Sequence, residues 1–185
     1  AGSDAPARPV TQLMWAVRLL LEAGFPSRST LWSMSLQDGV FNVTPQDFSR
    51  AVDVWEASVR ATHDFVTDAD LSIFRPMVTS ALPAIKELAC VRDGESQLAG
   101  FVAVVDGKVE MLFLHPDNRG QGGGKRLLEY AIREFAAVEL DVNEQNPQAI
   151  GFYERMGFDV VGRSERDGTG KPYPILHMRL RRHEG

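Results

Sequence analysis

Apolar residues between positions 44 and 61 recur at the spacing of an amphipathic helix. Separations of four, three and four positions place these residues on one helical face: Phe48, Val52, Trp55 and Val59. Thr44 followed by Pro45 offers an N-cap and a favoured first helical residue. The pattern therefore predicts a helix that runs to about Ala61.

Two further segments have helical patterns that are weaker. Residues 11–24 have one apolar side, with Thr11 as a candidate N-cap and Gly24 as a stop signal. Residues 69–81 also carry apolar residues at helical spacing, but Pro76 stands within them. We expect a short N-terminal helix that needs a packing partner, and a second element that is kinked or divided in two.

The second half of the chain alternates strand-like runs with helices. The dipeptides Asp93-Gly94 and Asp106-Gly107 are hairpin signals between three runs, which predicts an antiparallel meander. The expected elements, in order, are strands at Glu87–Arg92, Leu98–Val105 and Lys108–Leu114, a helix containing Leu127 to Phe135, a strand at Val138–Val142, a helix at Pro147–Met156, and strands at Phe158–Gly162 and Ile175–Leu180. Strands on both sides of helices indicate a layered α/β (α+β) architecture.

Composition restricts the class of protein. A length of 185 residues with 44% hydrophobic and 24% charged residues fits a globular chain with one sizeable core. The net charge of −5 disfavours general nucleic-acid binding. Arg18 and Glu22 interrupt the apolar stretch near the start, so we expect no membrane span. The single cysteine, Cys90, lies in an apolar run, which predicts a buried thiol and favours a cytoplasmic location.

The chain is predicted to divide into an N-terminal extension, residues 1–36, and one main domain, residues 37–185. The extension has four alternative interpretations: a helical segment, a sequence derived from an expression vector, a reading-frame extension upstream of a start at Met34, and a partner-binding arm. These alternatives remain open at the level of the sequence.

A glycine-rich segment from Arg119 to Gly124 stands between a strand and a helix. Such turns expose backbone amides to anions such as phosphate. A Walker loop would need glycine and Ser or Thr where the chain has Arg119 and Arg126. A dinucleotide fingerprint would need glycine where it has Lys125 or Leu127. Both of these nucleotide-binding motifs are therefore excluded.

The segment instead resembles the Arg/Gln-x-x-Gly-x-Gly/Ala loop of the GNAT superfamily of acetyl-CoA-dependent N-acetyltransferases. Residues 146–158, with the sequence NPQAIGFYERMGF, resemble the second conserved block of that family. Residues 61–65, 142–146 and 170–174 further resemble small bacterial members of the YjaB type. The resemblance covers about residues 40–180. It implies the GNAT fold, a mixed, mostly antiparallel twisted sheet of six to seven strands flanked by helices, with a splay between two parallel strands.

The resemblance also implies an acetyl-CoA site in the splay between the strands Lys108–Leu114 and Val138–Val142. The implied cofactor-binding residues are Leu112, Phe113, Leu114, Arg119, Gly120, Gln121, Gly122, Gly123, Gly124, Lys125, Asn146 and Tyr153. Pantetheine would pair with the strand backbone, and pyrophosphate would rest on the glycine loop. The alternatives are a merely flexible loop, solvated Arg119 and Lys125 side chains, and an Asn146 that only caps the helix after it.

Four residues are candidates for the chemistry of the reaction. Family resemblance assigns Tyr153 the role of general acid toward the departing thiolate, although it could be a core residue only. An alkyl ammonium, with a pKa near ~10.4, must lose a proton before it attacks a thioester. Strand alternation places Glu110 on the same side as Leu112 and Leu114, so Glu110 is the predicted base, unless it is a solvated strand residue. His63 is the alternative base. Asp64 could bind a cationic acceptor.

These residues lead to a functional hypothesis. We expect direct transfer of an acetyl group from acetyl-CoA to a primary amine, on either a small molecule or a protein. No metal is expected, because the histidines have no convincing ligand spacing. The resemblance also implies a homodimer, since dimers are common in that family. The alternative is a sensor or regulatory module that binds CoA without efficient catalysis.

Overall fold

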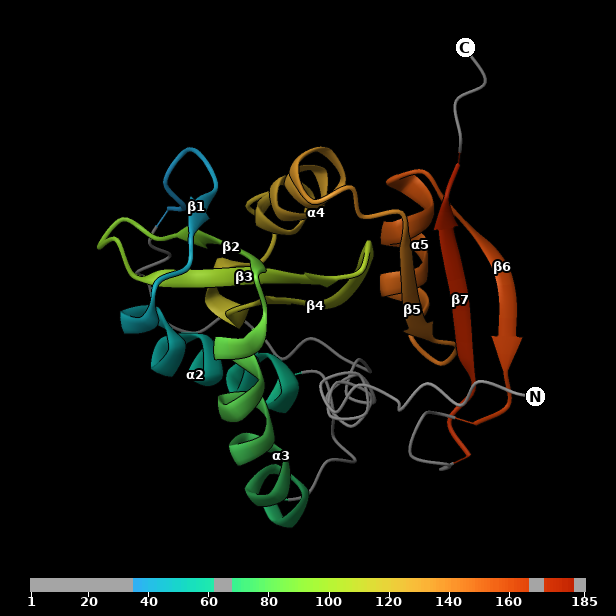
Figure 1. The fold of residues 1–185 in the computed structure, drawn as a ribbon, viewed down its shortest axis with the longest axis horizontal. Helices are drawn as coiled ribbons and strands as arrows, with labels where there is room; N and C mark the ends of the chain where they lie inside the picture. The colour runs from blue at the N-terminus through green and yellow to red at the C-terminus, as the bar shows by residue number, and fades with distance from the viewer. Residues whose placement is uncertain (1–34, 62–67, 167–171, 182–185) are drawn as a thin grey trace, which may run out of the picture.

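The structure is a computed structural model that describes residues 35–61, 68–166 and 172–181. Its strands form one seven-stranded sheet in the order β1-β2-β3-β4-β5-β7-β6 (Figure 1). The strands are β1 (Phe41–Asn42), β2 (Glu87–Arg92), β3 (Leu98–Val105), β4 (Lys108–Leu114), β5 (Glu139–Asn143), β6 (Phe158–Ser164) and β7 (Ile175–Leu180). Among the described strands β4 and β5 are the parallel pair, and the other neighbours are antiparallel. The mixed, mostly antiparallel sheet is therefore confirmed.

Four α-helices and three short 3-10 turns connect the described strands. They are η1 (Pro45–Asp47), α2 (Phe48–Arg60), α3 (Asp68–Ala81), η2 (Leu82–Ala84), η3 (Pro116–Asn118), α4 (Gly123–Glu134) and α5 (Pro147–Arg155). Within these ranges no helix is long and apolar enough to cross a membrane. The expected helix at residues 11–24 lies outside the described residues.

The predicted element boundaries hold closely, with three differences. A single helix, α3, runs through Pro76, because Leu71 and Val78 on either side of the proline pack into the same cluster. Strand β5 begins one residue late, since Val138 N donates instead to Gly107 O. Strand β6 continues to Ser164 through an irregularity after Val160.

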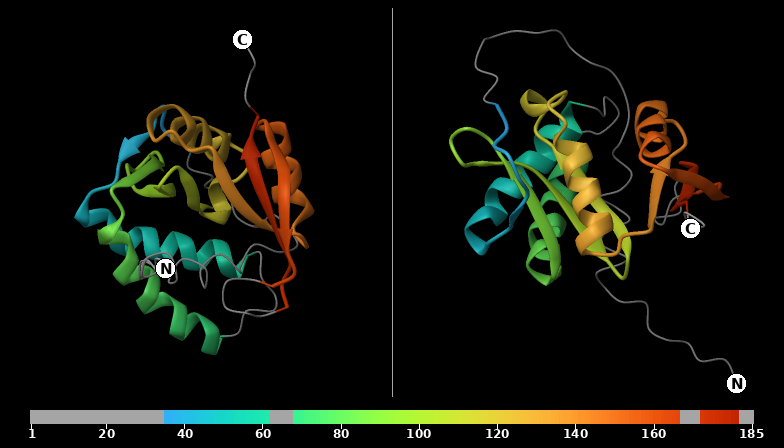
Figure 2. Two further views of the ribbon diagram at one scale, coloured as in Figure 1. Left: turned by 45° about the vertical axis from the view of Figure 1, so that its right-hand side comes forward. Right: turned by 90° about the horizontal axis from the view of Figure 1, so that it is seen from above.

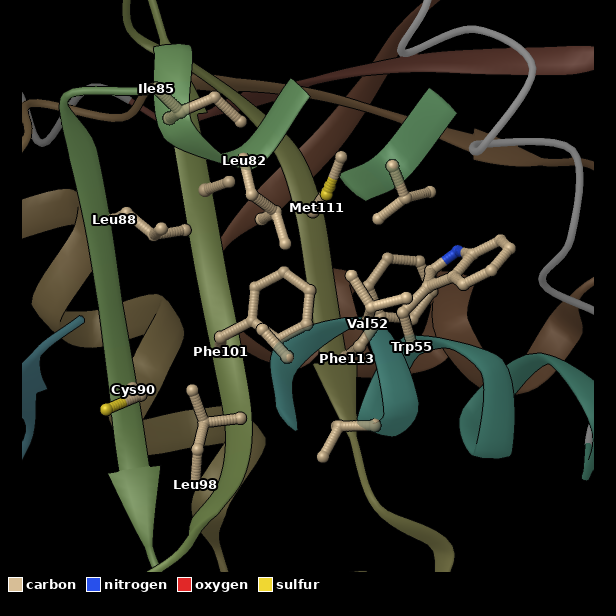
Figure 3. Packing of buried hydrophobic residues seen from close by; sticks show 14 of the residues in the cluster. Val52, Trp55, Leu82, Ile85, Leu88, Cys90, Leu98, Phe101, Met111 and Phe113 are labelled. Atoms are coloured by element: carbon tan, nitrogen blue, oxygen red, sulfur yellow. The ribbon is translucent and has the colours of Figure 1, made fainter. Parts of the chain in front are cut away.

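The helices cover the two faces of the sheet separately. Helices α2 and α3 pack on one face, around Trp55, Phe101 and Phe113 (Figure 3). Helices α4 and α5 pack on the other face, where Leu127 and Tyr153 belong to the second buried cluster. Cys90 is buried in the first cluster, and burial raises the pKa of its thiol to about 11. The predicted buried thiol is confirmed.

One partly buried ion pair joins η1 to β2. Asp47 accepts hydrogen bonds from Arg92 Nη1 and Nη2 at 2.9 and 3.0 Å, and from the Thr44 backbone N at 2.9 Å. The Arg92 hydrogen bonds lower the pKa of Asp47 from 3.8 to about 2. Because this pKa is lower in the folded protein, the stabilisation is present above about pH 3.8 and is lost as pH falls through about 2.

Replacing Arg92 by Met is therefore expected to lower the unfolding free energy by about 1–2 kcal/mol at pH 7. The same change should flatten the loss of stability between pH 4 and pH 2. Urea unfolding followed across this pH range measures both effects. Arg133→Met is the matched control, because its pair with Glu134 is exposed and should leave stability unchanged. An Arg92→Met profile parallel to that of the wild type would contradict the prediction.

Candidate active site

Strands β4 and β5 separate after two residue pairs. Their parallel register consists of Lys108 opposite Glu139 and Val109 opposite Leu140, and no described strand pairs with that edge of β4 beyond Val109. Figure 2 shows β5, β6 and β7 turned away from the plane of β3 and β4. The predicted splay is therefore present, and its vertex lies at Val109 and Leu140.

The backbone of β4 offers hydrogen-bonding groups to this splay. His115 N donates to Ala99 O at 2.8 Å, so this residue faces β3. In an antiparallel ladder successive residues direct their N–H and C=O groups to opposite edges. The backbone groups of Leu114 and Leu112 therefore face the open side of the splay. The side chain of Phe113 lies in the core beside Phe101, with ring centroids 5.8 Å apart, and by the same alternation its backbone N–H and C=O groups face β3 and not the splay.

A bulge in β4 lies immediately beyond the vertex. Pairing with β3 passes from Ala103–Met111 directly to Val104–Val109, which leaves Glu110 as the extra residue. Simple alternation from Leu112 therefore does not extend to Glu110. The catalytic role of Glu110 remains a prediction. His63 and Asp64 lie outside the described residues.

The glycine loop provides open backbone at the N-terminus of α4. Gly120 and Gly122 have φ values of 76° and 77°, a conformation that favours glycine, and a Cβ added at either would meet nothing within 4 Å. Gly123 is different, because its added Cβ would lie 2.6 Å from the Leu114 side chain. Two glycines thus leave space above the loop, and the third lets α4 approach β4 closely.

Side chains around the loop face different parts of the protein. Arg119 Nη2 donates to Ser58 Oγ of α2 at 3.0 Å, and burial lowers the pKa of Arg119. Gln121 Oε1 accepts from the Leu36 backbone N at 2.9 Å, which ties the start of the described chain to the loop. Lys125 is exposed and lies 3.7 Å from Glu129. Of these side chains, Lys125 is the cation most open to solvent.

Helix α5 holds two of the predicted residues. Asn146 caps the helix, since its Oδ1 accepts from Ala149 N at 2.9 Å. Tyr153 is buried in the same cluster that packs against Leu112 and Leu114. A Cβ at Gly124 would lie 3.3 Å from Leu114 and 3.7 Å from Phe152, so α5, α4 and the end of β4 meet here. The structure therefore brings α5, the loop and the open strand edge together.

The polar residues of β5 are not among the predicted site residues. Asn143 is 1% exposed, and its Nδ2 has no hydrogen-bond partner in the described part of the chain. A buried donor without a partner is costly unless a ligand or water accepts from it. Asp141, on the same face of β5, contacts Lys108 and His177. The strand pattern could have indicated this polar face, since Asp141 and Asn143 alternate with Leu140 and Val142.

Known proteins show similarity over most of this arrangement. The family profile described as an acetyltransferase (GNAT) domain matches residues 77–181. The peptidyl-lysine N-acetyltransferase YjaB of Salmonella typhimurium is 41% identical over 133 residues, which cover 72% of this chain and 91% of that protein. YjaB of Escherichia coli is 41% identical over 127 residues, 69% of this chain and 86% of that protein.

Structural comparison leads to the same family. The solution structure of apo YjaB from Escherichia coli matches with a TM-score of 0.68 at 37% identity, over 77% of this chain and 96% of that one. The expected YjaB-type resemblance is confirmed. Since the profile covers more than half of the chain and its relatives are N-acetyltransferases, the chain belongs to the GNAT family of acetyltransferases and is an acyltransferase enzyme.

Proposed function

We propose that this enzyme transfers the acetyl group of acetyl-CoA directly to a primary amine, and that the amine is the side chain of a protein lysine. Members of the family generally use acetyl-CoA. The observation that carries the proposal is the open edge of β4 at Leu112 and Leu114, which leads to the glycine loop at Gly120 and Gly122. The curated relatives named peptidyl-lysine N-acetyltransferases support lysine as the acceptor.

The residues present fit such a cofactor. The backbone groups of Leu112 and Leu114 match the amide-bearing pantetheine arm, because both are donors and acceptors in an extended geometry. The amides at Gly122 and Gly123 open α4, and helix N-termini favour phosphate. Asn143 Nδ2, which has no hydrogen-bond partner among the described residues, offers one further buried donor near the splay.

When bound, acetyl-CoA supplies an activated thioester. The chain's own residues then orient the reactants and move protons. Tyr153, buried on α5, is the proposed proton donor for the departing sulfur. Glu110 at the bulge is a candidate proton acceptor for the incoming ammonium. No nucleophilic side chain is required, because the amine attacks the thioester itself.

The proposal is tested by calorimetry and by a transfer assay with the same protein preparation. Acetyl-CoA should bind with micromolar Kd, about −8.2 kcal/mol. A lysine-containing peptide with an acetylated N-terminus should gain one acetyl group on Nε, detected by mass spectrometry, with equimolar free thiol. The same peptide with arginine in place of lysine is the control. Binding without thiol release would instead support the CoA-sensor hypothesis.

Two assignments outside the active site also remain predictions. A cytoplasmic location is predicted from the single buried cysteine. A homodimer is predicted from family resemblance, and light scattering of the purified chain measures it.

A further inference from the structure

Four polar side chains form a continuous hydrogen-bonded chain across the sheet. Lys108 Nζ lies 2.7 Å from Asp141 Oδ2, and Asp141 Oδ1 lies 2.7 Å from His177 Nδ1. His177 Nε2 in turn lies 2.8 Å from Ser164 Oγ. The four residues come from β4, β5, β7 and β6, so this series of hydrogen bonds crosses four neighbouring strands. We call it the polar chain.

The strand register builds this arrangement. Asp141 stands directly opposite His177 in the β5–β7 pair, and Gly162 stands opposite His177 in the β6–β7 pair. A Cβ at Gly162 would lie 3.4 Å from His177 Cδ2, so the imidazole packs against bare backbone. The pairing irregularity between Val160 and Gly162 sets this register. The ring is therefore held by both neighbouring strands.

The hydrogen bonds define a direction for proton movement. The Asp141 carboxylate accepts from Lys108 on one oxygen and from His177 Nδ1–H on the other. This tautomer leaves a lone pair on His177 Nε2, which accepts from the Ser164 hydroxyl. The side chain of Asp141 is 2% exposed and that of His177 is 32% exposed. The carboxylate is thus shielded behind an imidazole that solvent can reach.

The polar chain begins at the vertex of the splay. Asp141 directly follows Leu140, the last residue of β5 paired with β4. Asn143, whose amide nitrogen has no partner within the described ranges, lies two residues further along the same face of β5. Ser164 is the last residue of β6 and pairs with Ile175, which in turn pairs with Asn143, so Ser164 lies level with the open end of the splay, with β7 between it and β5.

We infer that His177 is the proton acceptor for the amine, with Ser164 passing the proton and Asp141 positioning the imidazole; the inference rests on the proposed transfer to an amine. The ammonium N–H bond breaks and its proton moves to Ser164 Oγ. The hydroxyl proton of Ser164 moves to His177 Nε2. The products are a neutral amine and an imidazolium paired with Asp141. The imidazolium then returns its proton to solvent, so the four side chains of the polar chain regain their starting protonation states after each turnover.

This assignment differs from the base predicted at Glu110. Glu110 is the extra residue of a bulge in β4, and His177 has a buried partner that fixes its tautomer and a hydroxyl that extends its reach. Other charged groups on the His177 face of β4 to β7 include Lys108 from β4, Glu139 and Asp141 from β5, Asp159 from β6, and Arg179 and Arg181 from the β7 segment. Glu139 pairs with Arg179, and Asp159 lies 3.5 Å from Arg181, so the opposite charges within each of these two pairs largely cancel.

The test compares His177→Gln and Ser164→Ala with the wild type in the lysine-peptide assay. His177→Gln is expected to lower kcat 10- to 100-fold, with the KM for acetyl-CoA within twofold. In the wild type kcat/KM should reach a plateau as pH rises. In His177→Gln it should keep rising toward the ordinary amine pKa of about 10.4. Ser164→Ala should lower kcat in the same direction, and Ser164→Thr should restore it because the hydroxyl is retained.

Arg163→Gln is the matched control. Arg163 neighbours Ser164 on β6, but it pairs with Glu144 and Glu165 at the surface, so kcat should be unchanged. Thermal melting checks the fold of each variant, and the Ser164 variants decide the question if His177→Gln does not fold. Wild-type rates and pH profiles in both His177→Gln and Ser164→Ala would overturn the role inferred for the polar chain, and would leave the proposed function unaffected. A wild-type protein that binds acetyl-CoA but acetylates no amine would contradict both the role inferred for the polar chain and the proposed function. A loss confined to Glu110→Gln would assign the base to Glu110 instead.

Discussion

Replacing Tyr153 by Phe is expected to lower kcat for lysine acetylation by about 10²-fold or more, while the Kd for acetyl-CoA stays within twofold. The Tyr153 side chain is buried, and its ring packs against Phe152 and Phe158 with centroid distances of 5.2 and 6.2 Å. Phenylalanine retains this ring and its packing. The substitution therefore removes the phenolic hydroxyl, which is the proposed acid, and keeps the ring.

Three measurements distinguish this loss from a structural effect. Initial rates of thiol release give kcat, calorimetry gives the Kd, and a thermal melt reports the fold. Tyr130→Phe is the matched control, because Tyr130 lies on α4 against Phe135 and Arg133 and has no proposed role in catalysis. If Tyr153→Phe turns over at the wild-type rate, Tyr153 is a core residue and the general acid must be sought elsewhere.

Replacing Gly122 by Leu is expected to weaken acetyl-CoA binding about 100-fold, or about 2.7 kcal/mol. Gly122 is the left-handed N-cap of α4, with φ 77°, and a Cβ there would project into the open space above the loop. That space is where the proposed pyrophosphate would rest. A side chain would block its approach to the amides.

Backbone strain must be separated from this steric effect, since leucine also disfavours a positive φ. Gly107→Leu is the control, because Gly107 has the same φ of 77° but lies in the β3–β4 turn. Calorimetry should show weak binding for Gly122→Leu and nearly wild-type binding for Gly107→Leu. Gly122→Ala provides a smaller change if the leucine variant does not fold. Wild-type affinity in every folded Gly122 variant would mean that the loop does not hold phosphate.

Local patterns in the sequence predicted most of the elements. The hairpin signals at Asp93-Gly94 and Asp106-Gly107 placed β2, β3 and β4 at their observed bounds, because turn chemistry acts between neighbouring residues. The helical stripe before Ala61 likewise anticipated α2. The continuous helix through Pro76 was harder to predict from the sequence, since packing on both sides of the proline outweighs the loss of the hydrogen bond that proline cannot donate.

The candidate active site likewise has parts that the sequence predicts and parts that it does not. The glycine loop and the Asn146 cap are continuous in sequence, so their local geometry could be anticipated from residue types alone. The bulge at Glu110 could not, because it exists only in the pairing of β4 with β3. The polar chain could not either, since Asp141 and His177 are 36 positions apart and meet only because β7 inserts between β5 and β6.

By itself the sequence determined the layered α/β class, the loop that opens α4 and the family resemblance, since each rests on residues adjacent along the chain. Tertiary structure decided where β4 leaves β5, which backbone groups face the splay, and which side chains reach Asp141. Strand order and register bring distant residues together. These depend on how the whole sheet packs against both layers of helices, and no short segment of the chain specifies them.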